Sequence, residues 1–177
     1  MRTFFALDLA PKTKLDIDQW RSKSLPMLER KIPMVNFHIT LCFNGTTDQF
    51  QINELQTQAE TVKVNQFDIT LDEFGYFSKP GIAFVGCSQI PPQLTELNKK
   101  LESISQQLGL STEKRPYKPH VTLFRRLSMP PPTPLMSPEF DMHVESFTLF
   151  ESVSLKQGVR YQPVFNWPLE RNCLLYT

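Results

Sequence analysis

Two short stretches of the chain share one pattern that is suited to acid–base chemistry. Residues 37–41 read Phe-His-Ile-Thr-Leu and residues 119–123 read Pro-His-Val-Thr-Leu, so His38 and His120 lie 82 residues apart. The chain has three histidines, and two of them within repeats of one pattern indicate a functional pair. The third, His143, lacks the pattern, and we expect it on the surface or on an edge strand.

Two imidazoles and two hydroxyls suit the cleavage of a phosphodiester. Histidine has an ordinary pKa of about 6.5, so it can accept or donate a proton near neutrality. One histidine would activate the attacking water and the other would protonate the departing ribose oxygen, each step contributing about 10²–10⁴-fold. Thr40 and Thr122 can donate hydrogen bonds to the non-bridging phosphate oxygens. We therefore expect His38, His120, Thr40 and Thr122 to be the catalytic residues.

The sequence predicts no metal and no cofactor at this site. No cluster of Asp or Glu accompanies the two histidines, and two histidines alone are a poor metal site. The three cysteines, Cys42, Cys87 and Cys173, form no Cys-x-x-Cys pair and are an odd number. Neither a structural zinc site nor a disulfide framework is expected from them.

Basic and aromatic residues offer candidate contacts to an anionic substrate. Alternation along a strand would place Arg125 with Val121 and Leu123, away from His120, unless the strand ends or bends after Phe124. We nevertheless expect Arg125, Phe43 and Tyr76 to bind substrate. Five basic residues lie between positions 114 and 126, with no acid among them: Lys114, Arg115, Lys118, Arg125 and Arg126. Possible stacking platforms for a base are Phe5, Phe43, Tyr76, Phe77 and Phe124.

Charge and composition narrow the class of partner. The net charge is +1, with 19 basic and 18 acidic residues among 177, whereas proteins that coat long nucleic acids carry a large basic excess. If RNA is the substrate, we expect a short piece or an end rather than a long duplex. No apolar stretch approaches the length of about 20 residues that spans a bilayer, and Asp8 interrupts the apolar N-terminal run. A cytoplasmic, membrane-independent monomer is expected.

Alternating side chains predict a strand over residues 35–43, ended by the turn signal Asn44-Gly45. In that strand His38, Thr40 and Cys42 should share one face, with Phe43 on the opposite, apolar face. Residues 119–124 form the second short strand of this kind.

The remaining periodicity predicts a mixture of strands and helices. The order favours an α+β fold with antiparallel hairpins over a doubly wound parallel sheet. A proline-rich stretch over residues 129–138 should be a surface loop. Strands are expected over residues 2–9, 67–74, 81–87, 143–155 and 159–167. Three helices are expected: one over residues 12–30 with a break at Pro26, one from a capping box at Asp48 to about residue 62, and one from Pro91-Pro92 to Gly109.

The paired His-x-Thr motifs resemble the signature of the two-histidine (2H) phosphoesterases. Within that group the chain is similar to the bacterial RNA 2',3'-cyclic phosphodiesterases, also called 2'-5' RNA ligases. The likeness extends beyond the motifs to most of the chain. It departs at Cys42, where the family often has a basic residue, which lessens the phosphate contact expected there. The similar segments are residues 2–9, 37–45, 115–125, 145–152 and 158–161.

The resemblance implies a single domain over residues 1–177 with two pseudo-symmetric lobes. Each lobe would be an antiparallel sheet with helices outside, and the lobes would face each other across a central cleft. The resemblance also makes His38 the proton donor and His120 the proton acceptor. It implies hydrolysis of RNA 2',3'-cyclic phosphate ends to 2'-phosphate ends and a reverse 2'-5' joining reaction without a nucleotide cofactor. The partners it implies are RNA ends or small 2',3'-cyclic nucleotides.

Two other functions remain open at the level of sequence. The chain could be a non-catalytic module that binds RNA ends or nucleotides on the same fold. It could also be a two-histidine enzyme for another cyclic phosphate, such as one derived from ADP-ribose. Product analysis with several cyclic phosphates separates these alternatives.

Overall fold

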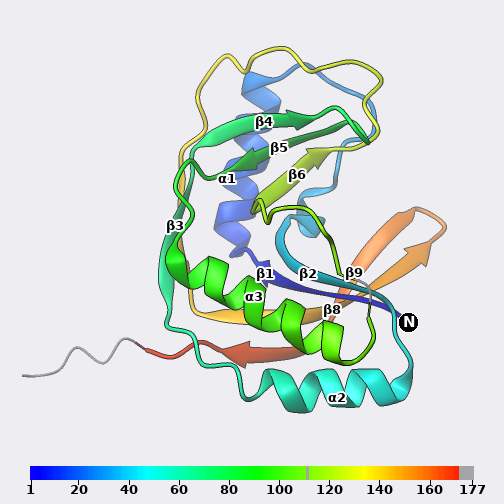
Figure 1. Ribbon diagram of the computed structural model, residues 1–177. Helices are drawn as coiled ribbons and strands as arrows, with labels where there is room; N and C mark the ends of the chain where they lie inside the picture. The colour runs from blue at the N-terminus through cyan, green and yellow to red at the C-terminus, as the bar shows by residue number, and fades with distance from the viewer. Residues whose placement is uncertain (111, 172–177) are drawn as a thin grey trace, which may run out of the picture.

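The computed structural model describes residues 1–110 and 112–171, and most of its strands form one large sheet (Figure 1). Seven strands lie in the order β4-β5-β6-β2-β1-β8-β9, and the paired neighbours are antiparallel. Their bounds are β1 (Arg2–Asp8), β2 (His38–Thr46), β4 (Glu73–Phe77), β5 (Ile82–Gly86), β6 (His120–Phe124), β8 (Ser146–Leu155) and β9 (Gly158–Pro168).

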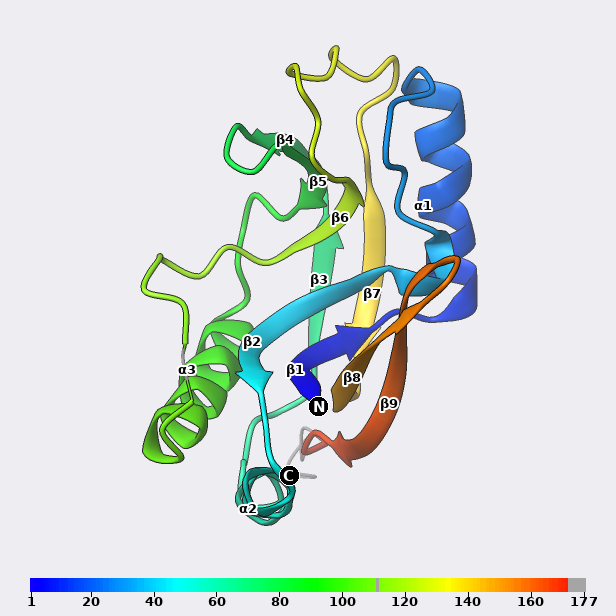
Figure 2. The ribbon, with the colours of Figure 1, turned by 90° about the vertical axis from the view of Figure 1, so that its right-hand side faces the viewer.

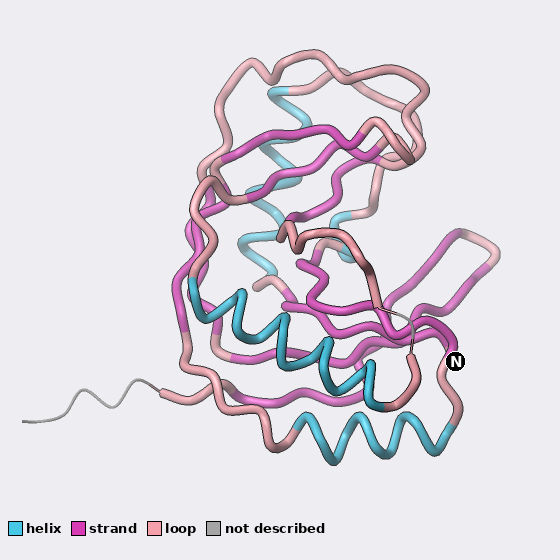
Figure 3. Tube along the Cα trace, viewed as in Figure 1, coloured by secondary structure: helices cyan, strands magenta, loops and turns pink. Residues whose placement is uncertain are grey.

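A second sheet and the helices surround this large sheet. β3 (Phe67–Leu71) and β7 (Phe140–Val144) pair antiparallel as a separate two-stranded sheet. In Figure 2, α1 (Pro11–Ser24) stands beside β7, while α3 (Pro92–Gln107) and α2 (Gln49–Ala59) lie on the opposite side of the molecule. A short 3₁₀ helix, η1 (Met34–Asn36), leads directly into β2. Long loops gather at the end of the molecule that contains β4, as a comparison of Figure 3 with Figure 1 shows.

The large sheet has a narrow joint at its centre. β2 and β6 share one ladder pair, Ile39 with Val121, whereas β1 and β2 pair over most of their length. The halves β4-β5-β6 and β2-β1-β8-β9 each contain one His-x-Thr motif. The predicted α+β fold with antiparallel sheets is therefore confirmed, and the two expected sheets are joined through this single pair.

Each motif strand carries a β-bulge at the leucine that follows the threonine. On β2, Thr40 pairs with Ala6 and Cys42 with Phe5, so Leu41 has no counterpart on β1. On β6, Thr122 pairs with Phe84 and Phe124 with Ala83, so Leu123 has no counterpart on β5. An extra residue of this kind reverses the alternation of the side chains that follow it.

Several predicted elements are confirmed. The apolar stripe Leu94, Leu97 and Leu101 is fully buried where α3 packs against β2. α2 begins at a capping box in which Asp48 and Gln51 each accept the other's backbone N–H. Residues 129–138 contain no helix or strand.

Three predicted boundaries are wrong. The expected strand 67–74 is divided at Asp72, whose carboxylate accepts hydrogen bonds from the backbone and hydroxyl of Ser88. β4 begins at Glu73, within that expected strand, and extends beyond it to Phe77. Glu145 likewise separates β7 from β8. The break predicted at Pro26 is confirmed, since Leu25 before it is extended with a ψ of 146°. The helix expected over residues 12–30 nevertheless ends at Ser24 and does not resume before residue 30.

The turn expected at Asn44-Gly45 is also absent. β2 continues through Gly45 to Thr46, and Asn44 is a second irregularity in the pairing with β1. Gly45 accommodates this distortion because it has a φ of 73°, which disfavours residues with a side chain.

Cys42 and Cys87 are buried thiols, and Cys173 lies outside the described residues. No helix among the residues described has the length and apolar character needed to cross a membrane.

Candidate active site

The two motifs meet at the Ile39–Val121 pair, which places them in a two-fold arrangement. Continuing this antiparallel register sets Thr40 opposite His120, and His38 opposite Thr122. These four side chains share the face opposite to that of Ile39 and Val121, since neighbours along a strand alternate. The histidines are diagonal neighbours, a relation that spans about 7–8 Å between Cα atoms in antiparallel pairs. That spacing suits two imidazoles acting on one phosphorus atom.

Both imidazoles are oriented by the same hydrogen bond. The Nδ1 atoms of His38 and His120 each lie 2.7 Å from the carbonyl oxygen two residues earlier, on Asn36 and Lys118 respectively. A carbonyl only accepts, so Nδ1 carries a proton in both rings, and Nε2 is left for chemistry. The Nε2 atom of His38 lies 3.0 Å from Thr40 Oγ1, which donates to it when the ring is neutral.

Aromatic rings flank each histidine. The His38 ring centroid lies 5.0 Å from that of Phe4 and 4.9 Å from that of Tyr161, which meets it edge-on. His120 lies 5.2 Å from Phe84, and 5.3 Å from Phe77, also nearly perpendicular. These rings fix the imidazoles and limit their access to water.

Burial lowers the pKa of both histidines. It lowers the pKa of His38 to about 4, and repulsion from Arg125 and His120 acts in the same direction. The pKa of His120 is also lowered, first by burial and then by Lys118 and Arg125. Arg125 lowers the pKa of both imidazoles, and His120 lowers that of His38. The three groups therefore lie close enough to interact electrostatically. An anion bound among them would raise both pKa values.

Arg125 lies on the histidine face, contrary to simple alternation. The bulge at Leu123 shifts the alternation by one residue, and β6 ends at Phe124. The guanidinium Nη2 of Arg125 lies 3.5 Å from the hydroxyl of Tyr161, whose ring contacts His38. The sequence alone permits this placement only where the strand ends or bends after Phe124, and β6 ends at that residue.

The bulge at Leu41 has the same effect on the first motif. Phe43 pairs with Phe4 and approaches its ring at 5.9 Å, so it lies on the histidine side rather than the predicted apolar side. Cys42 was expected beside the histidines but is buried on the opposite side, with its thiol 3.5 Å from Ser105 Oγ. Burial raises the pKa of Cys42 to about 11. A weaker phosphate contact was expected at position 42, but the side chain there faces the core and not the histidines.

The other aromatic candidates fall in different places. Phe77 contacts His120, and alternation along β4 directs its neighbour Tyr76 to the other face. Phe5 and Phe124 are buried in the core and offer no stacking surface. Sequence reasoning did not select Phe4, Phe84 and Tyr161 for the site, because their approach to the histidines depends on strand pairing that no local pattern reveals.

A small hollow beside His120 extends the candidate site. Its lining includes Thr40, Phe43, Arg115 and Lys118 together with His120. Two acids, Glu102 and Glu113, also line it, so its charge is mixed. The basic side chains can attract a phosphate, and the acids restrict where a polyanion can lie.

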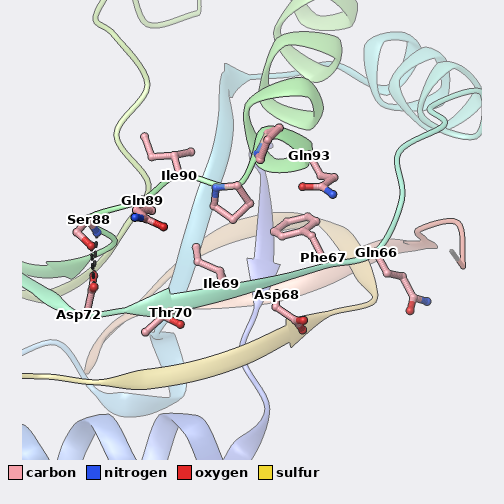
Figure 4. Close-up of a pocket in the computed structure, with 12 residues that line it drawn as sticks. Gln66, Phe67, Asp68, Ile69, Thr70, Asp72, Ser88, Gln89, Ile90 and Gln93 are labelled. Carbon is pink, nitrogen blue, oxygen red and sulfur yellow. Dashed lines mark hydrogen bonds between the residues drawn. The ribbon is translucent and has the colours of Figure 1, made fainter.

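A larger hollow lies elsewhere. It has a volume of about 680 Å³ and lies between β3 and the segment that leads into α3 (Figure 4). Neither motif histidine lines it. His143 is exposed on β7 and is hydrogen-bonded to Asp68 on β3 and to Gln66 just before it, in keeping with its predicted surface position. The described residues contain no group of three or more His, Cys, Asp or Glu placed to hold a metal ion.

The fold and the site together define a class: α+β proteins in which two His-x-Thr motifs meet at the centre of an antiparallel sheet. The family model of the 2'-5' RNA ligase superfamily matches residues 9–154. The chain belongs to this superfamily.

Curated relatives agree with this assignment. The chain is 30% identical to the RNA 2',3'-cyclic phosphodiesterase of Escherichia coli K12, over 95% of this chain and 96% of the relative. It is 31% identical to the protein of the same name from Bacillus subtilis 168, over 84% and 86% of the two chains.

Solved structures share the fold. The crystal structure of Escherichia coli LigT complexed with 3'-AMP matches with a TM-score of 0.89 and 31% identity, covering 95% of this chain and 97% of that one. TT0787 of Thermus thermophilus matches with a TM-score of 0.84 at 22% identity, over 97% of this chain and all of the other, and supports the fold alone.

Proposed function

We propose that this chain hydrolyses RNA 2',3'-cyclic phosphate ends to 2'-phosphate ends, with His38 and His120 as its acid–base pair. The observation that carries the proposal is the register of β2 and β6, in which the Ile39–Val121 pair sets both imidazoles on one face. The curated relatives named as RNA 2',3'-cyclic phosphodiesterases support the substrate class. In this proposal, residues 1–177 act as one bilobal domain.

The reaction needs one protonated and one neutral imidazole. His120, neutral at Nε2, takes a proton from water as the water oxygen attacks phosphorus. The bond from phosphorus to the ribose 3' oxygen breaks, and His38, protonated at Nε2, gives that oxygen a proton. The 2'-phosphate remains. This division of roles follows the family resemblance. With the 5'-hydroxyl of a second strand in place of water, the same steps would join the cyclic phosphate end to that hydroxyl through a 2'-5' linkage, as the bond from phosphorus to the 3' oxygen breaks.

The remaining polar groups hold the phosphate. The guanidinium of Arg125 can pair with a non-bridging oxygen, and its charge offsets the negative charge of the transition state. No protein hydrogen-bond partner is found for the Thr122 hydroxyl among the described residues, so it is available to the phosphate. The Thr40 hydroxyl is bonded to His38 Nε2 in the free state, and turns to the substrate once that nitrogen carries a proton.

Phe43 provides a surface for the terminal base. Its side chain is 46% exposed and lines the same hollow as Thr40 and His120. A base stacked on such a ring gains about 1–3 kcal/mol without selecting one sequence. Tyr76, directed away from His120, is omitted from the proposed contacts.

The decisive assay uses a short oligonucleotide that ends in a 2',3'-cyclic phosphate, incubated with purified protein. The expected product carries a 2'-phosphate, and His38→Asn and His120→Asn each lower the rate by at least about 10². His143→Asn is the matched control and should leave the rate unchanged. Binding of the oligonucleotide without any product would replace the enzyme with a binding module, and a near-normal rate in either motif variant would refute the acid–base pair.

A further inference from the structure

A helix behind the sheet fixes each of the two bulges. Asn98 on α3 donates through Nδ2 to the carbonyl oxygen of Leu41, at 2.8 Å. Arg21 on α1 donates through Nη1 to the carbonyl oxygen of Leu123, at 2.9 Å. The two polar residues are only 3% and 2% exposed, respectively. Two unrelated helices thus make the same contact to equivalent positions of the two motifs.

Arg21 also fills the space where β2 and β6 separate. Its guanidinium donates to the carbonyl oxygen of Ile32 at 2.8 Å and pairs with Asp18. The guanidinium carbon lies 4.8 Å from the ring centre of Phe37 and 5.5 Å from that of Phe124. Phe37 precedes His38, and Phe124 follows the second bulge. Figure 2 shows the start of β2 and the end of β6 both directed toward α1.

The bulges decide what the histidine face contains. In a regular strand the fifth residue after each histidine would alternate to the opposite face. The extra residues Leu41 and Leu123 reverse that alternation and bring Phe43 and Arg125 to the histidines. A bulged residue is left out of the regular ladder, so its buried carbonyl requires another donor. Leu123 also accepts the backbone N–H of Ile32 at 2.9 Å.

We propose that Arg21 and Asn98 are paired positioning residues for the reaction. Arg21 fixes the bulge that holds Arg125 on the histidine face, and Asn98 fixes the bulge that holds Phe43 there. Neither touches the substrate, and each acts through the residue that its bulge presents. The effect on turnover rests on the proposed function.

The test is a crossed set of double-mutant cycles. Arg21→Met and Asn98→Leu remove the donors and keep most of the volume, and each is combined with Arg125→Ala and with Phe43→Ala. Because Arg21 acts through Arg125, we expect Arg21→Met to lower kcat/KM by about 10-fold or more alone, but by less than about 2-fold in the Arg125→Ala background. Asn98→Leu should show the same dependence on Phe43→Ala. The crossed combinations, Arg21 with Phe43 and Asn98 with Arg125, should be multiplicative.

Controls separate positioning from simple loss of stability. Ile17→Ala and Leu97→Ala each remove a fully buried apolar side chain from α1 and α3, and should lower the melting temperature while preserving kcat/KM below it. Arg21→Lys retains the charge and one donor, and should recover part of the lost activity. It replaces Arg21→Met in the cycle if that variant does not fold.

The dissociation constant of 2'-AMP is measured for every variant of each cycle as a second readout, because binding requires no turnover. Absence of hydrolysis by the wild type would defeat the proposed function alone, since the binding cycle still tests positioning. Equal coupling in all four combinations, or losses no larger than those of Ile17→Ala and Leu97→Ala, would overturn the positioning roles.

Discussion

At the scale of single residues, the site depends on two imidazoles that are neutral when the protein is free. Burial lowers both pKa values, and the Nδ1 hydrogen bonds leave both Nε2 atoms unprotonated. The acid must therefore gain its proton as the anionic substrate binds. Arg125 opposes that protonation in the free state and then shares the phosphate with the imidazolium.

The pH dependence of kcat/KM follows from these shifts. Activity requires one proton on the pair, and that state is most populated between two pKa values that both lie below the ordinary 6.5. We expect kcat/KM for 2',3'-cyclic AMP to be greatest on the acidic side of 6.5 and to fall as the pH rises and the acid loses its proton. A maximum above about pH 7 would contradict the lowered pKa values.

His38 should also make the fold sensitive to acid. Its pKa is about 4 when folded and about 6.5 when unfolded, so the unfolded chain binds more protons in that interval. This contribution to stability is complete above pH 6.5 and is lost as the pH falls toward 4, a change of about 3 kcal/mol. Denaturant unfolding at several pH values should therefore show a weaker acid loss for His38→Asn than for the wild type. Parallel curves would indicate that His38 titrates normally.

At the scale of elements, features that depend on neighbouring residues could be predicted from the sequence, whereas features that depend on strand pairing could not. The repeated motif, the capping box at Asp48 and the stripe of α3 could be predicted because each depends on neighbouring residues. The faces of Phe43, Cys42 and Arg125 could not, because they depend on bulges that exist only against a partner strand. Arg21 lies in a helix of weak apolar periodicity, so nothing in the sequence connects it with the motifs.

Gly75 on β4 is a position where packing within the sheet leaves no room for a side chain. A Cβ there would lie 2.8 Å from a ring carbon of Phe84, and Phe84 contacts His120. We expect Gly75→Ala to displace that ring and lower kcat by about 10-fold or more with a lowered melting temperature. Glu73→Ala, on the same strand, is the matched control. Unchanged kcat in Gly75→Ala would show that Phe84 has no influence on His120.

The capping box of α2 should contribute to stability alone. Asp48→Ala removes the side-chain acceptor for the Gln51 N–H and should lower the free energy of unfolding by about 1 kcal/mol. Asn53→Ala, exposed in the same helix, controls for the helix surface. Because α2 contributes no residue to the site, kcat should stay at the wild-type value, and a loss of kcat would connect α2 with catalysis.

At the scale of the whole molecule, the site exists because two halves of one sheet meet at a single pair. Each half brings a histidine, a threonine and a bulge, and a helix buries a polar side chain against each bulge. The sequence predicted the fold class and the two motifs through the repeat and the resemblance. It did not reveal that Ile39 and Val121 pair directly, because 82 residues of chain separate the motifs.

The most direct test of two imidazoles converging on one phosphate is an NMR titration of the three histidine rings with 2'-AMP. His38 and His120 should respond with one common dissociation constant, and the pKa of each should rise on binding. His143, on the separate β3–β7 sheet, serves as the internal control and should not respond. A response from only one motif histidine, or from His143 equally, would contradict a shared phosphate site.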